Sequence, residues 1–287
     1  MNINWYPGHM AKTKKEIVEN LKLVDIVIEL LDARIPLASR NPDIKELTKN
    51  KKKIILLNKS DLADEFVNQK WIDKLSNEAS TMLTDANSGK GIDKVTKKID
   101  ELMKEEIEKQ AKRGRINKTI RVMVLGIPNV GKSSFINKIS KNKSMKVANI
   151  PGVTRKKQWI RMSNNQELLD TPGILWPRFD SQETALNLAF IGTIKDDLLE
   201  RTEVAQELLK VLDKKYRKNI LDRYKISNDE ILELEKKANY IYELMTLIAV
   251  KRGALISGGI IDDEKISRII LDDFRNCKLG NISLEEP

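Results

Sequence analysis

GIPNVGKS, the stretch from Gly126 to Ser133, decides the fold of this chain because of where it stands. It follows the apolar run IRVMVL and runs into SSFINKIS, which has the spacing of a helix. It also matches the pattern G-x-x-x-x-G-K-[ST], in which backbone N–H groups and a helix N-terminus surround phosphate groups. Lys132 would reach the β- and γ-phosphates, and the Ser133 hydroxyl would bind magnesium. The stretch therefore predicts a phosphate-loop nucleotide-binding domain.

Short apolar runs on either side of this stretch predict buried strands. They cover residues 24–31, 53–57, 81–83, 120–125, 158–162 and 167–169. Helical patterns lie between the first four of them, for example at 64–75 and 92–107. Strands that alternate with helices predict a mostly parallel sheet with helices on both faces, so the expected fold class is α/β.

The pattern changes near residue 178, after which the apolar residues recur at helical spacing. A chain of 287 residues has room for two domains. The sequence therefore predicts a phosphate-loop domain over residues 1–178 and a small all-α domain over 179–287. Asn228 and Asp229 are expected to cap one helix of the second domain. The expected helices of that domain cover residues 181–194, 203–212, 229–237, 240–250 and 262–275.

Two segments after the phosphate loop complete the set that binds phosphate and metal in such domains. DTPG ends the strand-like run QELLD, where Asp170 would hold magnesium and the Gly173 N–H would approach the γ-phosphate. NIPGVTR supplies Thr154, which would bind magnesium and sense the γ-phosphate. We therefore expect Mg²⁺ to be bound by Ser133, Thr154 and Asp170.

NKSD, from Asn58 to Asp61, follows the apolar run KIILL and fits a guanine-reading loop. The Asp61 carboxylate would accept hydrogen bonds from guanine N1–H and from the exocyclic amine of guanine. Adenine has neither donor and would leave a buried carboxylate unpaired, which is costly. The stem of Lys59 would cover the face of the base, and Asn58 would tie the loop to the phosphate loop. The expected ligands are therefore GTP and GDP.

A further segment, TDANSGKGI from Thr84, is a looser match to the loop that contacts guanine O6 in GTP-binding proteins. Asp85 and Asn87 stand where Ser and Lys are usual, and the backbone N–H of Ala86 would face the O6 atom. The nucleotide-binding residues that the sequence predicts are Asn58, Lys59, Asp61, Ala86, Asn87, Asn129, Val130, Gly131, Lys132, Ser133, Ser134 and Gly173.

The order of these segments is unusual, because the guanine reader at 58–61 precedes the phosphate loop instead of following it. The same sheet forms if the usual ends are joined and new ends are opened elsewhere, which close and exposed termini allow. The charged stretch 101–119 is then the join. The phosphate-sensing segment 170–173 leads directly into the helical domain, so loss of the γ-phosphate is expected to move or free that domain.

The order NKSD, GIPNVGKS, NIPGVT, DTPG, with WYPGHM near the N-terminus, resembles the circularly permuted GTPases. Within that group the chain is most similar to the ribosome biogenesis GTPase A family, from Trp5 to about Trp176. The resemblance implies a GTP-hydrolysing factor that binds the immature large ribosomal subunit, promotes its late maturation and is released by hydrolysis. It also implies that the helical domain binds ribosomal RNA.

The distribution of charge agrees with a polyanionic partner. Residues 1–179 hold 35 Lys and Arg against 21 Asp and Glu, a net charge of +14, whereas residues 180–287 hold 17 against 21, a net charge of −4. A basic first domain favours nucleic acid as the partner. Within the acidic half, residues 210–225 carry seven basic and two acidic side chains, which form either a solvated helix face or a second contact for RNA.

The composition also bears on the compartment. A single cysteine, Cys277, excludes an internal disulfide and fits a reducing environment. The N-terminus lacks the apolar core of a secretory signal, and no apolar run approaches the length of a membrane span. We therefore expect a cytoplasmic monomer that does not contact a membrane.

The residue after DTPG is Ile174, where many GTPases carry a glutamine that orients water, so hydrolysis by the protein alone is expected to be slow. His9, in GHM, resembles a histidine that the family implicates in catalysis, and imidazole suits proton handling near neutral pH. Asn129 would help to hold a monovalent cation such as K⁺ against the phosphates. The ribosomal particle would complete the site and stimulate hydrolysis. The catalytic candidates are His9, Lys132, Thr154 and Gly173.

Other functions remain open from the sequence. A GTPase that acts in tRNA modification would need further catalytic residues, commonly a reactive cysteine, and Cys277 alone does not supply them. NKSD argues against a phosphate-loop kinase of small molecules, and the magnesium ligands argue against a module that only holds nucleotide. A site that reads guanine and a diphosphate could also admit guanosine tetraphosphate as a competitor, which a competition assay would test.

Overall fold

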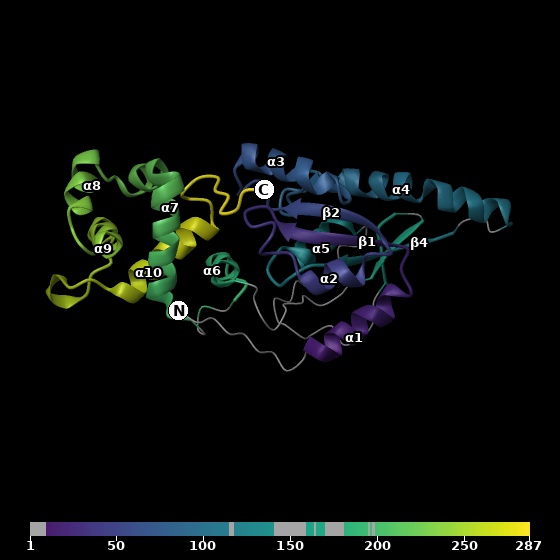
Figure 1. Ribbon diagram of the computed structural model, residues 1–287, viewed down its shortest axis with the longest axis horizontal. Coiled ribbons are helices and arrows are strands. Elements are labelled where there is room, and N and C mark those ends of the chain that lie inside the picture. The colour runs from purple at the N-terminus through teal and green to yellow at the C-terminus, as the bar shows by residue number, and fades with distance from the viewer. Residues whose placement is uncertain are drawn as a thin grey trace. The chain divides into compact units, whose positions relative to one another are not determined.

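A computed structural model describes residues 10–114, 118–140, 159–163, 165–169, 181–194, 196 and 199–287. The described residues fall into two compact units. One contains the described residues up to 169 together with Glu285–Pro287, and the other contains those from 181 to Leu284 (Figure 1). These are the sheet unit and the helical unit, respectively.

The sheet unit is built on a six-stranded sheet with the strand order β3-β2-β1-β4-β6-β5. All neighbouring strands are parallel except β5, which pairs antiparallel with β6 at one edge. Each predicted strand is present within two residues of its expected bounds, and the mostly parallel sheet is confirmed. The strands are β1 (Ile26–Asp32), β2 (Lys52–Asn58), β3 (Ser80–Leu83), β4 (Ile120–Leu125), β5 (Trp159–Arg161) and β6 (Gln166–Leu169).

Strand β1 lies at the centre of the sheet, between β2 and β4, although it is the first strand in the chain. All of its residues are buried, and it pairs with both neighbours, with Asp32 beside Asn58 and Ile28 beside Val124. The chain moves outward from β1 to β2 and β3, then returns through a long helix to β4 on the other side of β1. Because the carboxyl ends of parallel strands meet at one edge of a sheet, the ends of β1, β2 and β4 are neighbours there.

Helices cover both faces of the sheet, as Figure 1 shows. On one face, the first three helices pack against alternate residues of β1, including Val27 and Leu31. On the other face, Gln166 of β6 donates a hydrogen bond to the carbonyl of Thr96 in α4, and α5 packs beside α4. Cover on both faces explains why every residue of β1 is buried and why the strand is apolar except at Glu29 and at its last residue, Asp32. The helices are α1 (Met10–Leu21), α2 (Pro42–Leu47), α3 (Glu65–Ser76), α4 (Ile92–Lys112) and α5 (Lys132–Ile139).

The helices α3, α4 and α5 follow the sequence prediction, whereas α1 and α2 are not evident in the sequence. Helix α2 has six residues, starts at Pro42 and is capped by Asn41, whose side chain accepts a hydrogen bond from the Asp43 N–H. So short a helix shows no readable period. Helix α1 contributes Ile17 and Leu21 to the core beneath it.

The last residues of the chain belong to the sheet unit. The Glu285 carboxylate accepts hydrogen bonds from the backbone N–H of Leu37 at 2.6 Å and of Ala38 at 3.0 Å. The Glu285 carbonyl accepts a third from Nε1 of Trp71 at 3.3 Å. These contacts join positions from the two ends of the sequence, so no local pattern predicts them.

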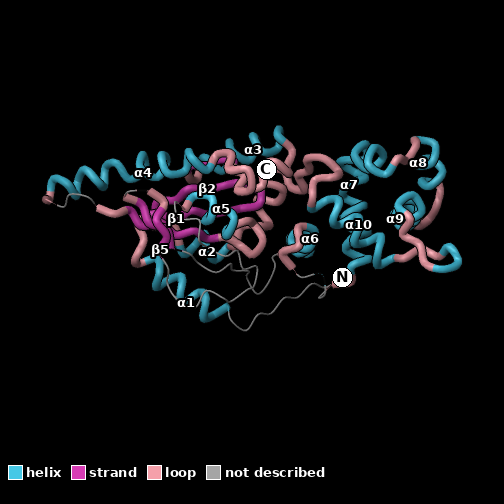
Figure 2. Tube along the Cα trace, turned by 180° about the vertical axis from the view of Figure 1, so that it is seen from behind, coloured by secondary structure: helices cyan, strands magenta, loops and turns pink. Residues whose placement is uncertain are grey.

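The helical unit consists of helices and loops, as expected from the sequence (Figure 2). Each of its five predicted helices is present. None of the helices that the structure describes is long and apolar enough to cross a membrane. The helices of this unit are α6 (Gln182–Phe190), α7 (Arg201–Tyr224), α8 (Asn228–Glu235), α9 (Tyr240–Arg252) and α10 (Asp263–Arg275).

Helix α7 is much longer than the prediction, which ends it at residue 212. It continues to Tyr224 through a kink at Tyr216, whose φ and ψ are −135° and 33°. In the added part, the buried apolar residues are Ile220 and Tyr224. Two apolar contacts within a run of charged residues are too few to reveal a helical period, which is why the sequence prediction stopped early.

The start of α8 also differs from the prediction. Ser227 is the capping residue, since its side chain accepts a hydrogen bond from the Glu230 N–H while the Glu230 carboxylate accepts one from the Ser227 N–H. This reciprocal pair is a capping box. Asn228 and Asp229, expected to be the cap, are instead the first two residues of the helix.

Candidate nucleotide-binding site

The phosphate loop lies between the end of β4 and the start of α5, as the sequence predicts. Gly131, the last residue before α5, has a φ of +95°, which glycine adopts readily. A Cβ atom at this position would lie 2.4 Å from Nδ2 of Asn58. Glycine is therefore required here both for the turn and for the close approach of the predicted guanine-reading segment.

Lys132, the first residue of α5, is the buried cation of the loop. It is 9% exposed, and its ammonium group donates to the carbonyls of Gly126 at 2.9 Å and Ile127 at 2.7 Å. These bonds hold a positive charge beside the loop N–H groups and the helix N-terminus, which also favour anions. Ser133 and Ser134 follow on the first turn of α5, and Ser133 is exposed. The arrangement suits the binding of phosphate groups.

Asn58, at the end of β2, joins three of the predicted segments. Its Nδ2 donates to the carbonyl of Val130 in the phosphate loop at 2.7 Å, which is the tie expected from the sequence. Its Oδ1 accepts hydrogen bonds from the Ala86 N–H at 3.0 Å and from the Thr84 hydroxyl at 3.3 Å. From the sequence, we expect the Ala86 N–H to face the base, whereas in the structure it donates to Asn58.

Lys59 extends from the same segment to the phosphate loop. Its Nζ donates to the carbonyl of Asn129 at 2.6 Å and lies 3.1 Å from Oδ2 of Asp32. Burial lowers the pKa of Lys59, and the Asp32 carboxylate opposes that shift. Lys59 and Asn129 have φ values of 58° and 64°, a left-handed backbone that side chains rarely adopt. Two unusual backbone positions are thus joined by one hydrogen bond.

Asp61, the predicted guanine reader, is exposed and lies within electrostatic reach of Asp85. Partial loss of its water raises the pKa of Asp61, and the charge of Asp85 raises it further. Burial would also raise the pKa of Asp85, but hydrogen bonds from Ser88 and from Asn87 hold it below its ordinary value. The N–H groups of Asn87 and Ser88 donate to the Asp85 carboxylate at 2.8 and 3.2 Å. Asp85 therefore stays ionised beside the predicted reader.

Several predicted site residues lie outside the described residues, so their roles stay predictions. They are His9, Thr154, Asp170 and Gly173. Ile174, which follows the last of them, is also outside. Of the three predicted magnesium ligands, the structure describes Ser133.

Two residues that belong to none of the predicted nucleotide-binding segments lie next to Lys59. Asp32, the last residue of β1, is fully buried, and Arg34 is 2% exposed. The Arg34 guanidinium donates to both oxygens of the Asp32 carboxylate, each at 2.9 Å. A signal for Asp32 exists in the sequence, because it ends an apolar run in the same way as Asp170. A charged residue at the carboxyl end of a central parallel strand is a candidate for a site.

The part of the chain that contains the phosphate loop matches the model of a known protein family. A family model described as "50S ribosome-binding GTPase" matches residues 121–249. The match starts within β4 and includes the phosphate loop, but it does not reach the predicted guanine reader at 58–61.

Comparisons over the full length of the chain extend this finding. All of the chain aligns at 41% identity with "Ribosome biogenesis GTPase A" of Bacillus cereus, covering 95% of that protein. A protein of the same name from Priestia megaterium is 42% identical over the whole chain, with 98% of its own length covered. Both relatives are therefore similar to this chain from end to end.

Solved structures of YlqF are also similar to this chain over nearly its whole length. A GDP-bound structure of YlqF matches with a TM-score of 0.67 and 26% identity, covering 95% of this chain and 99% of the other. The GNP-bound YlqF from T. maritima matches with a TM-score of 0.67 and 25% identity, covering 96% of this chain and 98% of the other.

Proposed function

Because the chain belongs to the ribosome biogenesis GTPase A family, it is a GTPase that acts in ribosome assembly, and we propose that it promotes the late maturation of the large ribosomal subunit. In this proposal it binds the immature particle with GTP and is released when GTP is hydrolysed. The observation that carries the nucleotide-dependent part of this proposal is the pair of contacts from Asn58 to Val130 and from Lys59 to Asn129. These contacts join the guanine-reading segment to the phosphate loop, so that one nucleotide can reach both.

The base and the phosphates are bound by different groups. Asp61 accepts hydrogen bonds from the N1–H and the amine of guanine, and the stem of Lys59 covers the base. Lys132 and the N–H groups of the loop bind the phosphates, where backbone donors and a helix N-terminus act together. Support comes from the position of Lys132, which is already buried within the curve of the loop.

Magnesium would accompany the triphosphate, as in other phosphate-loop enzymes. Ser133 fits this role because it is an exposed residue next to Lys132 in the chain and carries a hydroxyl, and Mg²⁺ prefers oxygen ligands together with phosphate oxygens. Thr154 and Asp170 would complete the ligand set. The metal supplies positive charge at the phosphate oxygens, while Lys132 and the loop orient the same phosphates.

A monovalent cation beside Asn129 is proposed to supply part of the positive charge that an arginine provides in other GTPases. Asn129 is fixed at the phosphate loop, since its carbonyl accepts the Lys59 ammonium. Turnover is expected to be about tenfold higher in potassium chloride than in sodium chloride at equal ionic strength. Affinity for GDP, measured in both salts, is the control, and equal turnover in the two salts would exclude the cation.

Substitution of His9 by Ala is expected to lower ribosome-stimulated turnover by about 10²- to 10³-fold and to leave GTP affinity nearly unchanged. Ile174 cannot orient water, and His9 is the single histidine of the chain. Single-turnover hydrolysis with and without large subunits measures the effect. His9→Gln, which retains hydrogen bonding but not protonation, separates water orientation from proton transfer. If stimulated turnover survives in the Ala variant, His9 is not catalytic.

Asp85→Asn is expected to move the acid limit of GDP binding to lower pH. Asp61 must be ionised to accept from guanine, and its pKa lies above its ordinary value through partial loss of water and the charge of Asp85. Binding therefore weakens as pH falls through this raised pKa. Asn keeps the acceptor for the Asn87 N–H but removes the charge, so the pKa of Asp61 falls. GDP affinity from pH 4 to 7, with unfolding followed at each pH, measures this, and an unchanged midpoint would contradict it.

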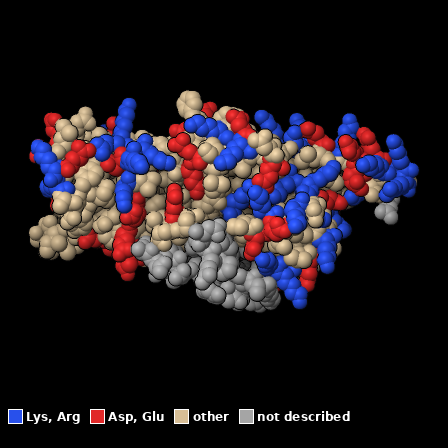
Figure 3. All heavy atoms as spheres, viewed as in Figure 1, with Lys and Arg blue, Asp and Glu red and all other residues tan. Residues whose placement is uncertain are grey.

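Ribosomal RNA is proposed to bind both units. In the sheet unit, positive charge is in excess over residues 1–179, and Figure 3 shows Lys and Arg side chains gathered around α1 and α4 on one face. In the helical unit, a cleft of about 600 Å³ lies between the end of α7 and the turn after α10, with Lys218, Arg223, Lys225 and Lys278 in its lining. The buried Asp273 carboxylate contacts two of these cations, Arg223 at 2.9 Å and Lys278 at 3.3 Å. Asp222 also lines the cleft, so its four cations face two carboxylates, and positive charge remains in excess, which suits RNA phosphates.

Co-sedimentation with large ribosomal subunits tests this function. The protein is expected to sediment with immature subunits most strongly with a GTP analogue, and weakly with GDP or without nucleotide. The double variant Lys218→Gln with Lys278→Gln should reduce sedimentation by about tenfold and weaken its dependence on salt. Lys236→Gln, at the exposed residue that directly follows α8, is the matched control. Equal sedimentation in all three nucleotide states would contradict the proposed release by hydrolysis.

A further inference from the structure

We propose that the buried pair Asp32–Arg34 positions the guanine reader, by holding Lys59 in the conformation that bridges to the phosphate loop. Neither residue would touch the nucleotide, so both are positioning residues. The inference rests on the proposed assignment of residues 58–61 as the guanine reader. It extends that assignment to the end of β1, which no motif of nucleotide binding marks.

The geometry of the pair is rigid. Oδ1 of Asp32 accepts from the backbone N–H of Arg34 at 3.1 Å and from its Nε at 2.9 Å, while Oδ2 accepts from Nη2 at 2.9 Å. Two parallel bonds between a guanidinium and a carboxylate fix the orientation of both groups. The Asp32 N–H donates to the Ser39 hydroxyl at 3.0 Å, which fixes the backbone of the strand end as well.

The same carboxylate reaches the reader. Oδ2 of Asp32, which accepts from Arg34, also lies 3.1 Å from Nζ of Lys59. Nζ in turn donates to the carbonyl of Asn129 at 2.6 Å. A backbone hydrogen bond also joins the end of β1 to this segment, because the Ala33 N–H donates to the Asn58 carbonyl at 2.8 Å. The end of β1 is therefore joined to the reader through both a side chain and the main chain.

Lys59 needs such support because of its backbone. Its φ of 58° is a conformation that persists in a non-glycine residue only where the surroundings determine it. Its carbonyl accepts a hydrogen bond from the Leu62 N–H at 2.9 Å, which closes a tight turn that contains Asp61. Movement of Lys59 would therefore move the carboxylate that reads the base.

The charges explain why Asp32 is the central member. Burial alone would raise the pKa of Asp32, but the positive charges of Arg34 and Lys59 outweigh burial and hold the pKa below its ordinary value. Arg34 and Lys59 also repel each other, which adds to the effect of burial in lowering the pKa of Lys59. Without the negative charge between them, the two cations would separate, and Lys59 would leave Asn129.

The test is the ratio of affinities for GDP and inosine diphosphate in the variant Asp32→Asn. Inosine lacks the exocyclic amine, so this ratio reports how well Asp61 is placed. The ratio is expected to fall about tenfold, the effect of losing one hydrogen bond to a charged group. Partial unfolding would weaken both nucleotides equally and leave the ratio unchanged. Competition with inorganic pyrophosphate, which has no base, should be unaffected.

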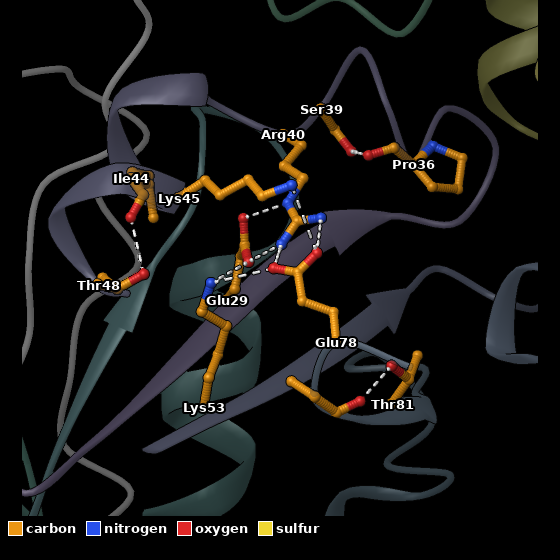
Figure 4. Close-up of polar contacts among 11 residues, drawn as sticks. Glu29, Pro36, Ser39, Arg40, Ile44, Lys45, Thr48, Lys53, Glu78 and Thr81 are labelled. Carbon is orange, nitrogen blue, oxygen red and sulfur yellow. Dashed lines mark hydrogen bonds and ion pairs between the residues drawn. The ribbon is translucent and has the colours of Figure 1, made fainter. Parts of the chain in front are cut away.

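Glu29→Gln is the matched control. Glu29 lies three residues earlier on β1, is 1% exposed and accepts a guanidinium fork from Arg40 at 3.0 and 2.9 Å. Figure 4 shows Arg40 between the carboxylates of Glu29 and Glu78, with Lys53 beside them. Among the described residues, the ion pairs of Glu29 are with Arg40 and Lys53, away from the reader. This variant should lower the thermal unfolding temperature but keep the wild-type ratio.

The outcomes separate this inference from the assignment on which it rests. If Asp61→Asn keeps the wild-type ratio, the assignment of the reader is wrong. If Asp61→Asn lowers the ratio but Asp32→Asn does not, or if Glu29→Gln lowers it equally, the positioning role is overturned. Should Asp32→Asn fail to fold, Arg34→Lys retains the charge but not the fork, and it should lower the ratio by a smaller factor. A wild-type ratio in that variant would also overturn the inference.

Discussion

Replacement of Asp61 by Asn is expected to turn the preference of the site from guanine to xanthine nucleotides. The carboxylate would accept from N1–H and from the amine of guanine, whereas an amide presents one donor and one acceptor. Xanthine has a carbonyl in place of the amine, so it matches the amide and mismatches the carboxylate. Sites built from such polar contacts discriminate strongly, and the ratio of affinities for GDP and XDP should change by about 10⁴-fold.

Competition against a fluorescent guanine nucleotide measures this ratio. Asp64→Asn is the matched control, because Asp64 lies three residues further along and caps α3 by accepting from the N–H groups of Phe66 and Val67. Asn also caps helices well, so this variant should keep both its fold and its preference for guanine. A retained preference for GDP in the Asp61 variant would show that another residue reads the base.

Replacement of Lys132 by Ala is expected to weaken the binding of GTP and GDP by roughly 10²- to 10³-fold. The ammonium group is the buried cation of the phosphate loop, held by the carbonyls of Gly126 and Ile127. Its removal takes away a charge that would bind two phosphate groups where water has little access. Isothermal titration with GDP and with a GTP analogue measures the loss.

Lys138→Ala is the control for this change. Lys138 belongs to the same helix but is exposed, and its Nζ donates to the Asn87 carbonyl at 3.4 Å. Its removal should alter nucleotide affinity by less than about threefold. If the Lys132 variant retained wild-type affinity, the phosphates would have to bind elsewhere, and the assignment of GIPNVGKS would be wrong.

The fold and the centre of the site were largely predictable from sequence because strand ends carry the motifs. NKSD starts at the last residue of β2 and GIPNVGKS follows β4, and each motif comes directly after a buried apolar run, at 54–57 and 122–125. In a parallel sheet, such ends meet at one edge whatever the order of the strands in the chain. The contact between Asn58 and Val130 could be expected for that reason, although the residues are 72 positions apart.

The remaining features depend on contacts that a local pattern does not contain. The charged end of α7 buries few apolar side chains, so its helical period is not visible in the sequence. Helix α2 is too short to show a period. The roles of Asp32 and Arg34 were missed because the run before them was interpreted only as a buried strand. The Glu285 carboxylate accepts hydrogen bonds from Leu37 and Ala38, which lie near the other end of the sequence, and nothing near Glu285 in the sequence indicates these contacts.

The central place of β1 has a consequence for synthesis of the protein. Its partner on one side, β2, is translated soon after it, but its partner on the other side, β4, ends only at Leu125. A ribosome adds about 5–20 residues per second, so the edge of β1 that pairs with β4 stays unpaired for roughly 5–20 s during synthesis. An open strand edge can pair with the same edge of another nascent chain. Mutations that slow the arrival of β4 should therefore reduce the yield of protein before they change its affinity for nucleotide.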